Sequence, residues 1–241
     1  MPAAPDATPP AAPDAAPSAT ANAAPPAVLL DMDGTLVDTE PLWWQAAAEL
    51  AAELGLTLGE DDLPDVLGRA AEHTAAHLRR SGSSDRSVDD LTGALNSGFA
   101  RRVAAEVVPR PGALALLAGL RAAGVPTALV SASPRRVVDL VLGAIGPQWF
   151  TVTLAAEDTP RTKPDPAPYL AAAGRLGLDP ADCVAVEDSP AGVASATAAG
   201  CAVLAVPSAV PIEAAGRVTL LDSLEQADLA LLGRLAADRP A

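Results

Sequence analysis

The stretch AVLLDMDGT at residues 27–35 decides the fold of this 241-residue chain. Four apolar residues come first, at 27–30, and the acids Asp31 and Asp33 follow them directly. A short apolar run of this kind predicts a strand that is buried on both faces, as in a parallel sheet. The two acids then lie at the carboxyl end of that strand, where open parallel sheets bind their ligands.

The same pattern recurs along the chain. Segments of helical length, rich in alanine and leucine, separate further apolar runs at residues 125–130, 151–154, 183–186 and 201–206. Glycines that suit helix C-termini close four of these segments, at Gly124, Gly146, Gly177 and Gly200. Strands that alternate with helices predict an α/β fold, with a doubly wound, Rossmann-like parallel sheet covered by helices on both faces.

Two segments depart from this alternation. Residues 1–26 are nearly all alanine and proline, a composition that predicts a disordered tail. Residues 41–108 contain no convincing strand and offer three helical candidates, at 42–54, 61–80 and 88–107. We therefore expect a core domain formed by residues 27–40 and 109–241, with an α-helical domain of residues 41–108 inserted after the first strand.

Composition and charge exclude several classes of protein. The formal net charge is −14, a field that repels nucleic acids and anionic membrane surfaces. No apolar run approaches the roughly 18–20 residues that are needed to span a bilayer. Two cysteines are too few for a secreted disulfide framework and suit a reducing compartment. These features predict a cytoplasmic protein, monomeric, with no nucleic-acid or membrane partner and with a small-molecule ligand.

Acids gather where the predicted strands end. Asp31 and Asp33 flank one residue, so an extended backbone places both carboxylates on the same face. Glu187 and Asp188 follow the run at 183–186. Carboxylates this close repel one another unless a cation lies between them, and oxygen ligands without histidine or cysteine suit Mg²⁺.

Groups that could bind and transfer a phosphate lie at the same edge. Gly34 and Thr35 open a turn whose backbone N–H groups can face an anion, and Ser131 follows the second predicted strand. Fifteen of the 16 basic residues are arginine, and the one lysine, Lys163, stands in a loop at this edge. One carboxylate could then attack phosphorus and a second handle protons, while Lys163 neutralises charge.

Four ordered motifs resemble those of the haloacid dehalogenase superfamily, specifically its branch of phosphatases and β-phosphoglucomutase-like enzymes with a helical cap. The resemblance covers residues 27 to about 235. Its motifs are DMDGTLVDT at 31–39, Ser131 after an apolar strand, Lys163 followed by PDP, and EDSPAG at 187–192.

The resemblance implies a role for each site residue. It implies that Asp31 forms an aspartyl-phosphate, that Asp33 acts as general acid and base, and that Ser131 and Lys163 complete the catalytic set. The phosphate group would be bound by Gly34, Thr35, Ser131, Ala132 and Lys163. Mg²⁺ would be held by Asp31, the backbone carbonyl of Asp33, Asp188, and Glu187 directly or through water.

The residues favour one activity of this superfamily. Asp33 argues against dehalogenation, and the absence of lysine from residues 41–108 argues against phosphonate cleavage through a Schiff base. We therefore expect a Mg²⁺-dependent phosphatase acting on a small soluble phosphomonoester, with sugar phosphates as candidates. The alternatives are a β-phosphoglucomutase-like mutase and a non-catalytic protein that binds phospho-ligands. Trp43 stands where the mutases have histidine, and Leu67-Gly68-Arg69 supplies a single cation, which disfavours the mutase.

Several other residues have a possible role at the surface, at the substrate or in packing. His73 and His77 are four apart on a predicted helix, and their alanine-rich surroundings indicate an exposed face rather than a zinc site. Arg135 and Ser133 follow the second motif closely enough for either to reach the substrate. Trp43 and Trp44 stand at the entrance of the predicted helical domain, where one of them either lines the substrate pocket or packs at the junction of the two domains.

Overall fold

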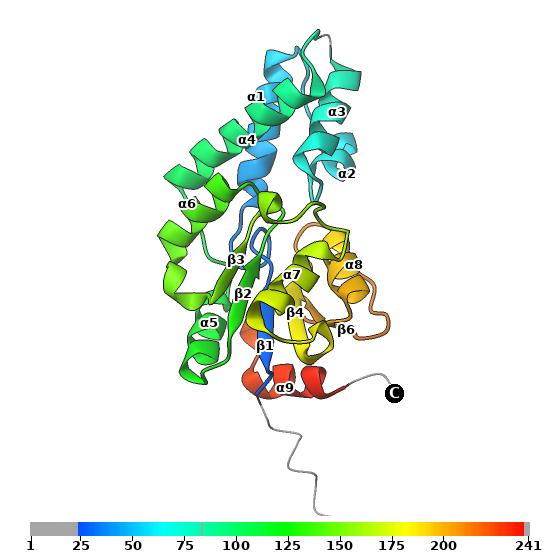
Figure 1. Cartoon of the computed structure of the whole chain (residues 1–241). Helices are drawn as coiled ribbons and strands as arrows, with labels where there is room; N and C mark the ends of the chain where they lie inside the picture. The colour runs from blue at the N-terminus through cyan, green and yellow to red at the C-terminus, as the bar shows by residue number, and fades with distance from the viewer. Residues whose placement is uncertain (1–23, 83, 239–241) are drawn as a thin grey trace, which may run out of the picture.

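The computed structural model describes residues 24–82 and 84–238. The predicted tail at 1–26 therefore lies almost wholly outside the described residues. The described chain forms a sheet flanked by helices, with a group of further helices standing beyond one end of the sheet (Figure 1).

The sheet has six parallel strands in the order β3-β2-β1-β4-β5-β6. The first strand, β1 (Ala27–Leu30), is central and pairs with β2 (Thr127–Val130) and β4 (Cys183–Glu187). The remaining strands are β3 (Val152–Leu154), β5 (Ala202–Ala205) and β6 (Val218–Leu220). The predicted α/β class and parallel sheet are confirmed. The sequence did not predict β6, a three-residue edge strand that is only partly buried.

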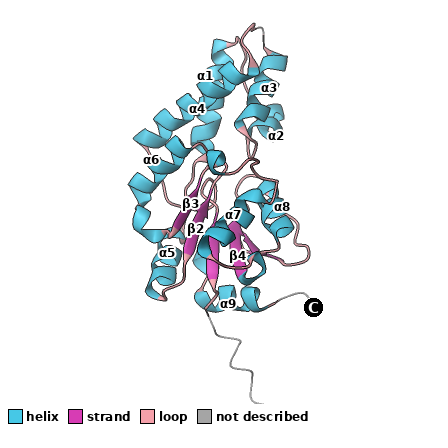
Figure 2. Ribbon diagram, viewed as in Figure 1, coloured by secondary structure: helices cyan, strands magenta, loops and turns pink. Residues whose placement is uncertain are grey.

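Helices cover both faces of the sheet (Figure 2). Val28 and Leu30 point to the face covered by α5 (Ala113–Ala122), α6 (Arg135–Ile145) and α9 (Leu229–Ala237). Ala27 and Leu29 point to the opposite face, which is covered by α7 (Ala167–Leu176) and α8 (Pro190–Ala199). Strand residues alternate between two apolar layers because successive side chains leave the backbone in opposite directions.

The inserted segment consists of helices α1 (Glu40–Glu53), α2 (Leu63–Val66), α3 (Ala71–Ser81) and α4 (Val88–Ala105). They share an apolar cluster of their own, and Ala46 of α1 together with Phe99, Ala100 and Val103 of α4 also packs in the cluster on one face of the sheet. The two chain segments that connect this insertion to the sheet run side by side, because Val37 forms an antiparallel bridge with Pro109. No described helix is long and apolar enough to cross a membrane.

The prediction of one helix over residues 61–80 is wrong. The chain forms the short helix α2, leaves the helical conformation at 67–70 and then starts α3. Gly68 has a φ of +65°, a left-handed conformation that glycine adopts without strain and that ends a right-handed helix. The break matters because its residues face the cavity described below.

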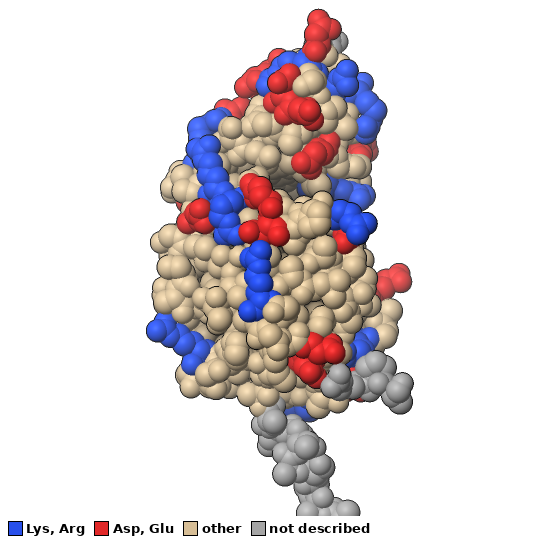
Figure 3. Space-filling view, viewed as in Figure 1, with Lys and Arg blue, Asp and Glu red and all other residues tan. Residues whose placement is uncertain are grey.

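Acidic and basic side chains are interspersed on the face of the molecule shown in Figure 3. Neither sign of charge forms one broad patch over that face, although the chain as a whole carries a formal net charge of −14. This face therefore offers no extended basic surface of the kind that nucleic-acid binding requires.

Candidate active site

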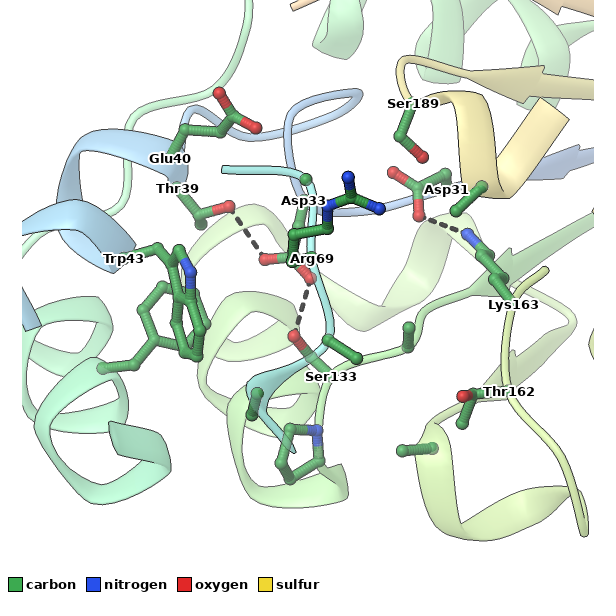
Figure 4. A pocket seen from close by; sticks show the side chains of 18 of the residues that line it. Asp31, Asp33, Thr39, Glu40, Trp43, Arg69, Ser133, Thr162, Lys163 and Ser189 are labelled. Carbon is green, nitrogen blue, oxygen red and sulfur yellow. Dashed lines mark hydrogen bonds and ion pairs between the residues drawn. The ribbon is translucent and has the colours of Figure 1, made fainter. Parts of the chain in front are cut away.

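The carboxyl edge of the sheet gathers the residues that the sequence singled out. Asp31 follows β1, Ser131 follows β2, and Asp188 follows β4; all three are at least 94% buried. Lys163 reaches the same edge from the loop before α7 (Figure 4). Strands in parallel register end together, so residues far apart in the sequence meet here.

Lys163 is bound by three oxygen atoms. Its Nζ lies 2.5 Å from Asp31 Oδ1, 2.6 Å from Glu187 Oε1 and 2.9 Å from the carbonyl oxygen of Val130. Its side chain is only 6% exposed. Burial alone would lower the pKa of Lys163, but attraction by the Asp31 and Glu187 carboxylates outweighs that effect and raises the pKa. The ammonium group therefore stays charged at the site.

Tyr169 was missed by the sequence analysis. Its fully buried phenol donates a hydrogen bond of 2.5 Å to Glu187 Oε1, and its ring centroid lies 5.3 Å from Lys163 Nζ. The other oxygen of Glu187 accepts longer hydrogen bonds from the Asp188 backbone N–H and the Ser189 hydroxyl, both at 3.3 Å. Glu187, itself fixed by these hydrogen bonds, thus positions the ammonium group of Lys163. The chain contains a single tyrosine, a signal that the composition did carry.

Asp33 accepts hydrogen bonds from three hydroxyl groups (Figure 4). Thr39 Oγ1 lies 2.8 Å from Oδ1, while Ser133 Oγ at 2.8 Å and Ser131 Oγ at 3.2 Å donate to Oδ2. Burial raises the pKa of Asp33, and the three hydroxyl donors oppose that rise only in part. A raised pKa favours the protonated form of a carboxyl group, which is the form that a general acid needs. The structure thus brings Ser133 into the site, and it adds Thr39, which the sequence analysis gave no role.

The acids of this edge fit a divalent cation. Asp31, Glu187 and Asp188 can each offer an oxygen such that all three lie within 4.8 Å of one another. Asp31 Oδ2 is buried and has no hydrogen-bond partner within the described chain. Burial raises the pKa of Asp188, and repulsion by Asp31 and Glu187 raises it further, so bound positive charge would relieve the cluster.

Backbone and hydroxyl groups position Asp188 within this cluster. Thr35 Oγ1 donates to its Oδ1 at 3.2 Å, and Ser208, from the loop after β5, donates a short hydrogen bond to its Oδ2. A Cβ atom at Gly34 would lie 2.1 Å from Asp188 Oδ2, so no larger residue fits there. The sequence analysis missed Ser208, because no motif surrounds it. The carboxylate oxygens of Asp31, Glu187 and Asp188 are hard donors, the type of ligand that Mg²⁺ prefers.

A cavity of about 320 Å³ opens between this edge and the insertion. Asp31, Asp33 and Lys163 line it from the side of the sheet, together with Ala132 of the second motif. Residues 41–108 contribute Trp43, Arg69, Glu72 and Phe99, and Glu40, which directly precedes them, also lines the cavity. Trp43 therefore lines the pocket, one of the two roles considered for it.

Arg135 and the two histidines do not line this cavity. Arg135 does not line the cavity, and its guanidinium pairs with Asp158 and donates to Thr153. His77 is not exposed as expected: its side chain is 14% exposed, with Nε2 2.7 Å from Asp62 and Nδ1 3.5 Å from Asp65.

The histidines instead connect the short helix α2 to α3. Like His77, His73 also contacts Asp65, through Nε2 at 2.7 Å. Within the described residues, neither histidine belongs to a group of three that could hold a metal ion. In the structure, both histidines pair with acids beside the break at 67–70.

Glu40 gives the first testable prediction. Burial raises the pKa of its carboxyl from 4.5 to about 7, and repulsion by Asp38 and Asp33 adds to the rise, which Arg110 opposes. A raised pKa in the folded state means that Glu40 contributes stability below pH 4.5, and this stability is lost as the pH rises through about 7. We expect the Glu40→Gln variant to gain melting temperature over the wild type as the pH rises from 5 to 8.

The comparison is made by thermal denaturation in EDTA-containing buffers at both pH values. Glu53→Gln, on the same helix but exposed, serves as the matched control and should show no such trend. A difference between wild type and Glu40→Gln that stays constant with pH would contradict the prediction.

Comparison with known proteins agrees with this geometry. Residues 25–200 match the family of haloacid dehalogenase-like hydrolases. Hexitol phosphatase A of Escherichia coli (strain K12) is 37% identical over 202 residues, which cover 82% of this chain and 91% of that protein. Hexitol phosphatase B of the same strain is 34% identical, covering 76% of this chain and 83% of that protein.

A solved structure shows the same fold. The crystal structure of CbbY from Rhodobacter sphaeroides in complex with phosphate superposes with a TM-score of 0.74 at 27% identity, covering 84% of this chain and 96% of CbbY. The family match spans most of the chain and includes all four motifs. The chain therefore belongs to the haloacid dehalogenase-like hydrolase family, as its four motifs indicated.

Proposed function

We propose that the protein is a Mg²⁺-dependent phosphatase that hydrolyses a small phosphomonoester through an aspartyl-phosphate on Asp31. The observation that carries this proposal is the state of the Asp31 carboxylate. One of its oxygens is held by Lys163, while the other is buried, unpartnered and part of a residue that lines the cavity. A carboxylate so placed can offer one oxygen to Mg²⁺ and the other to phosphorus. The named hexitol phosphatase relatives support a sugar or polyol phosphate as substrate.

The reaction would proceed in two displacements. Asp31 forms a bond to phosphorus as the bond to the leaving oxygen breaks, and Asp33 donates its proton to that oxygen. Asp33 then takes a proton from water, which attacks phosphorus and releases Asp31. Asp31, Asp188 and the backbone carbonyl of Asp33, with Glu187 directly or through water, would hold Mg²⁺, which would supply positive charge to stabilise the transferring phosphoryl group. Lys163 and Ser131 bind the transferred group, and the backbone at 34–35 and Ala132 completes its site.

The surroundings of the site fit a small-molecule enzyme. We propose that residues 41–108 act as a cap over residues 27–40 and 109–241, because the cavity lies between the two groups of elements. We also propose that the enzyme is a cytoplasmic monomer. Its two cysteines are free and buried, which supports a reducing compartment.

Hydrolysis of p-nitrophenyl phosphate, with Mg²⁺ or with EDTA, tests the proposed activity. We expect turnover with Mg²⁺ and its loss with EDTA, followed by faster turnover of one or more esters in a panel of phosphorylated metabolites. Binding of phosphate esters without any turnover would instead support the non-catalytic alternative. Conversion of β-glucose 1-phosphate to glucose 6-phosphate would support the mutase.

Mg²⁺ should also stabilise the fold. At a concentration ten times its dissociation constant, a ligand that binds only the folded state adds about 1.4 kcal/mol. For a chain of this size, that corresponds to a rise of about 3–6 °C in melting temperature. The Asp188→Asn variant should melt higher than the wild type in EDTA, because a repelling charge is removed, and should lose most of the Mg²⁺ effect. An equal Mg²⁺ effect in both proteins would remove Asp188 from the metal site.

Lys163 should not be replaceable by arginine. Three acceptors lie within 2.9 Å of one nitrogen, and a planar guanidinium is wider and has a fixed geometry. We expect Lys163→Arg and Lys163→Ala each to lower kcat by roughly 10²-fold or more, the effect of losing one preorganised electrostatic group. Steady-state kinetics with a circular dichroism check on both variants provide the measurement. Wild-type turnover by Lys163→Arg would show that the position requires positive charge alone.

A further inference from the structure

The carboxylate of Asp188, a ligand in the proposed metal site, is held by a residue from outside the four motifs. Ser208 lies in the segment between β5 and β6 and donates a short hydrogen bond to Asp188 Oδ2. Thr35 donates to Oδ1 of the same carboxylate at 3.2 Å. Each oxygen of a carboxylate can accept more than one bond, so the two hydroxyl groups leave room for a cation on Asp188.

The surroundings of Asp188 leave its side chain little freedom to turn. Asp188 is 3% exposed. A Cβ atom at Gly34 would lie 2.1 Å from Asp188 Oδ2 and 3.0 Å from Ser208 Oγ, so the backbone of this glycine packs against both groups. Carboxylates that lie as close as those of Asp31, Glu187 and Asp188 repel one another. A hydroxyl donor on each oxygen holds the orientation of the Asp188 carboxylate against that repulsion.

The segment that carries Ser208 is fixed at both ends. At its start, the backbone N–H of Val206 donates to the carbonyl oxygen of Glu187 at 2.7 Å, directly beside the acidic cluster. At its end, the guanidinium of Arg217 donates to the carbonyl oxygen of Gly200 at 2.9 Å. The Ser208 hydroxyl therefore stands on a backbone whose position is set by the sheet and by the end of α8.

Resting on the proposed Mg²⁺-dependent function, we propose that Ser208 is a positioning residue that presets Asp188 for Mg²⁺ and thereby sets the preference of the site for Mg²⁺ over Ca²⁺. Mg²⁺ requires near-octahedral geometry with ligands at about 2.0–2.1 Å, whereas Ca²⁺ accepts variable geometry at about 2.3–2.6 Å. Removing a group that orients a metal ligand typically weakens metal binding by about 10–100-fold. Loss of the Ser208 hydroxyl should therefore weaken Mg²⁺ binding more than Ca²⁺ binding.

Calorimetric titration of the metal-free protein with Mg²⁺ and with Ca²⁺ tests the proposal independently of turnover. We expect Ser208→Ala to raise the Kd for Mg²⁺ by at least about tenfold. We expect the same variant to raise the Kd for Ca²⁺ by about threefold or less, so that the preference for Mg²⁺ falls. Circular dichroism of each variant in EDTA provides the check that it is folded.

Val210→Ala is the matched control in the same segment. Val210 Cγ2 lies 3.8 Å from the point where a Cβ atom of Gly68 would stand, so the variant loosens the packing of the segment against the insertion and keeps the Ser208 hydroxyl. Its affinity for Mg²⁺ and its preference over Ca²⁺ should stay close to those of the wild type. An equal loss of Mg²⁺ affinity in Val210→Ala and Ser208→Ala would overturn the assignment to the hydroxyl.

The outcomes separate this proposal from the proposed function. If Ser208→Ala binds Mg²⁺ as the wild type does, or loses the same factor of affinity for both ions, the role of Ser208 is overturned while the phosphatase activity stays intact. Absence of Mg²⁺ binding to the wild type, together with absence of Mg²⁺-dependent turnover of p-nitrophenyl phosphate, would overturn the proposed function, and this inference with it.

Discussion

Replacing Asp31 with asparagine should lower turnover of every phosphomonoester by at least about 10³-fold. The substitution keeps the size of the side chain but removes the charge of the oxygen that would attack phosphorus. It also removes the carboxylate that binds Lys163 Nζ at 2.5 Å. A 10³-fold loss corresponds to about 4 kcal/mol of activation free energy. The measurement is steady-state hydrolysis of p-nitrophenyl phosphate by wild type and variant.

Two controls accompany this variant. Asp139→Asn removes an exposed carboxylate on α6, outside the cavity, and should keep wild-type kinetics. Mass spectrometry after acid quenching should detect phosphate bound to the wild type during turnover and none on Asp31→Asn. Appreciable turnover by a clean preparation of Asp31→Asn would exclude Asp31 as the nucleophile.

The Asp33→Asn variant should lose about 10²–10⁴-fold in turnover, the range for removing a general acid and base. Asparagine can accept a hydrogen bond from one of Thr39 and Ser133 through Oδ1 and donate through Nδ2 to the hydroxyl oxygen of the other, so the local structure should persist. The loss should depend on the leaving group, because an alkyl alcohol needs a proton on departure and p-nitrophenol does not. We therefore expect a larger loss for alkyl phosphates than for p-nitrophenyl phosphate.

That dependence is the critical measurement for Asp33. Rates for a series of esters with leaving groups of increasing pKa would be compared between variant and wild type. A loss of the same size across the series would argue against protonation of the leaving oxygen by Asp33. Ala132, whose side chain cannot transfer a proton, lines the same cavity, and Ala132→Gly should leave the slope of the series unchanged.

The central sheet could be predicted from the sequence because its strands are buried on both faces. Residues 27–30 and 183–186 read as uninterrupted apolar runs, and the functional acids follow each run directly. The edge strand β6 has the same VTL sequence as β3 and was missed although its composition favours a strand; it is short and only partly buried. The helix break at Gly68 was missed because the sequence on both sides has helical composition.

The site was predictable where one motif supplies both the backbone geometry and the functional group. Tyr169 and Ser208 act instead through contacts with residues that lie 18 and 20 positions away in the sequence. Such contacts depend on where α7 and the loop after β5 pack, which no local pattern encodes. The composition held one usable signal, since the chain's only lysine and only tyrosine contact each other at the site.

The interruption of the core by the insertion imposes an order on folding during synthesis. β1 leaves the ribosome early, but its first partner in the described sheet begins at Thr127. Helices α1 to α4 are made in the interval and have an apolar cluster of their own to bury. Domains generally fold as units while the chain is being made. We therefore expect the nascent chain to form this helical unit first, while the apolar segment of β1 is still without a partner strand. The segment at 27–30 is thus the part of the core that a chaperone could bind for the longest time.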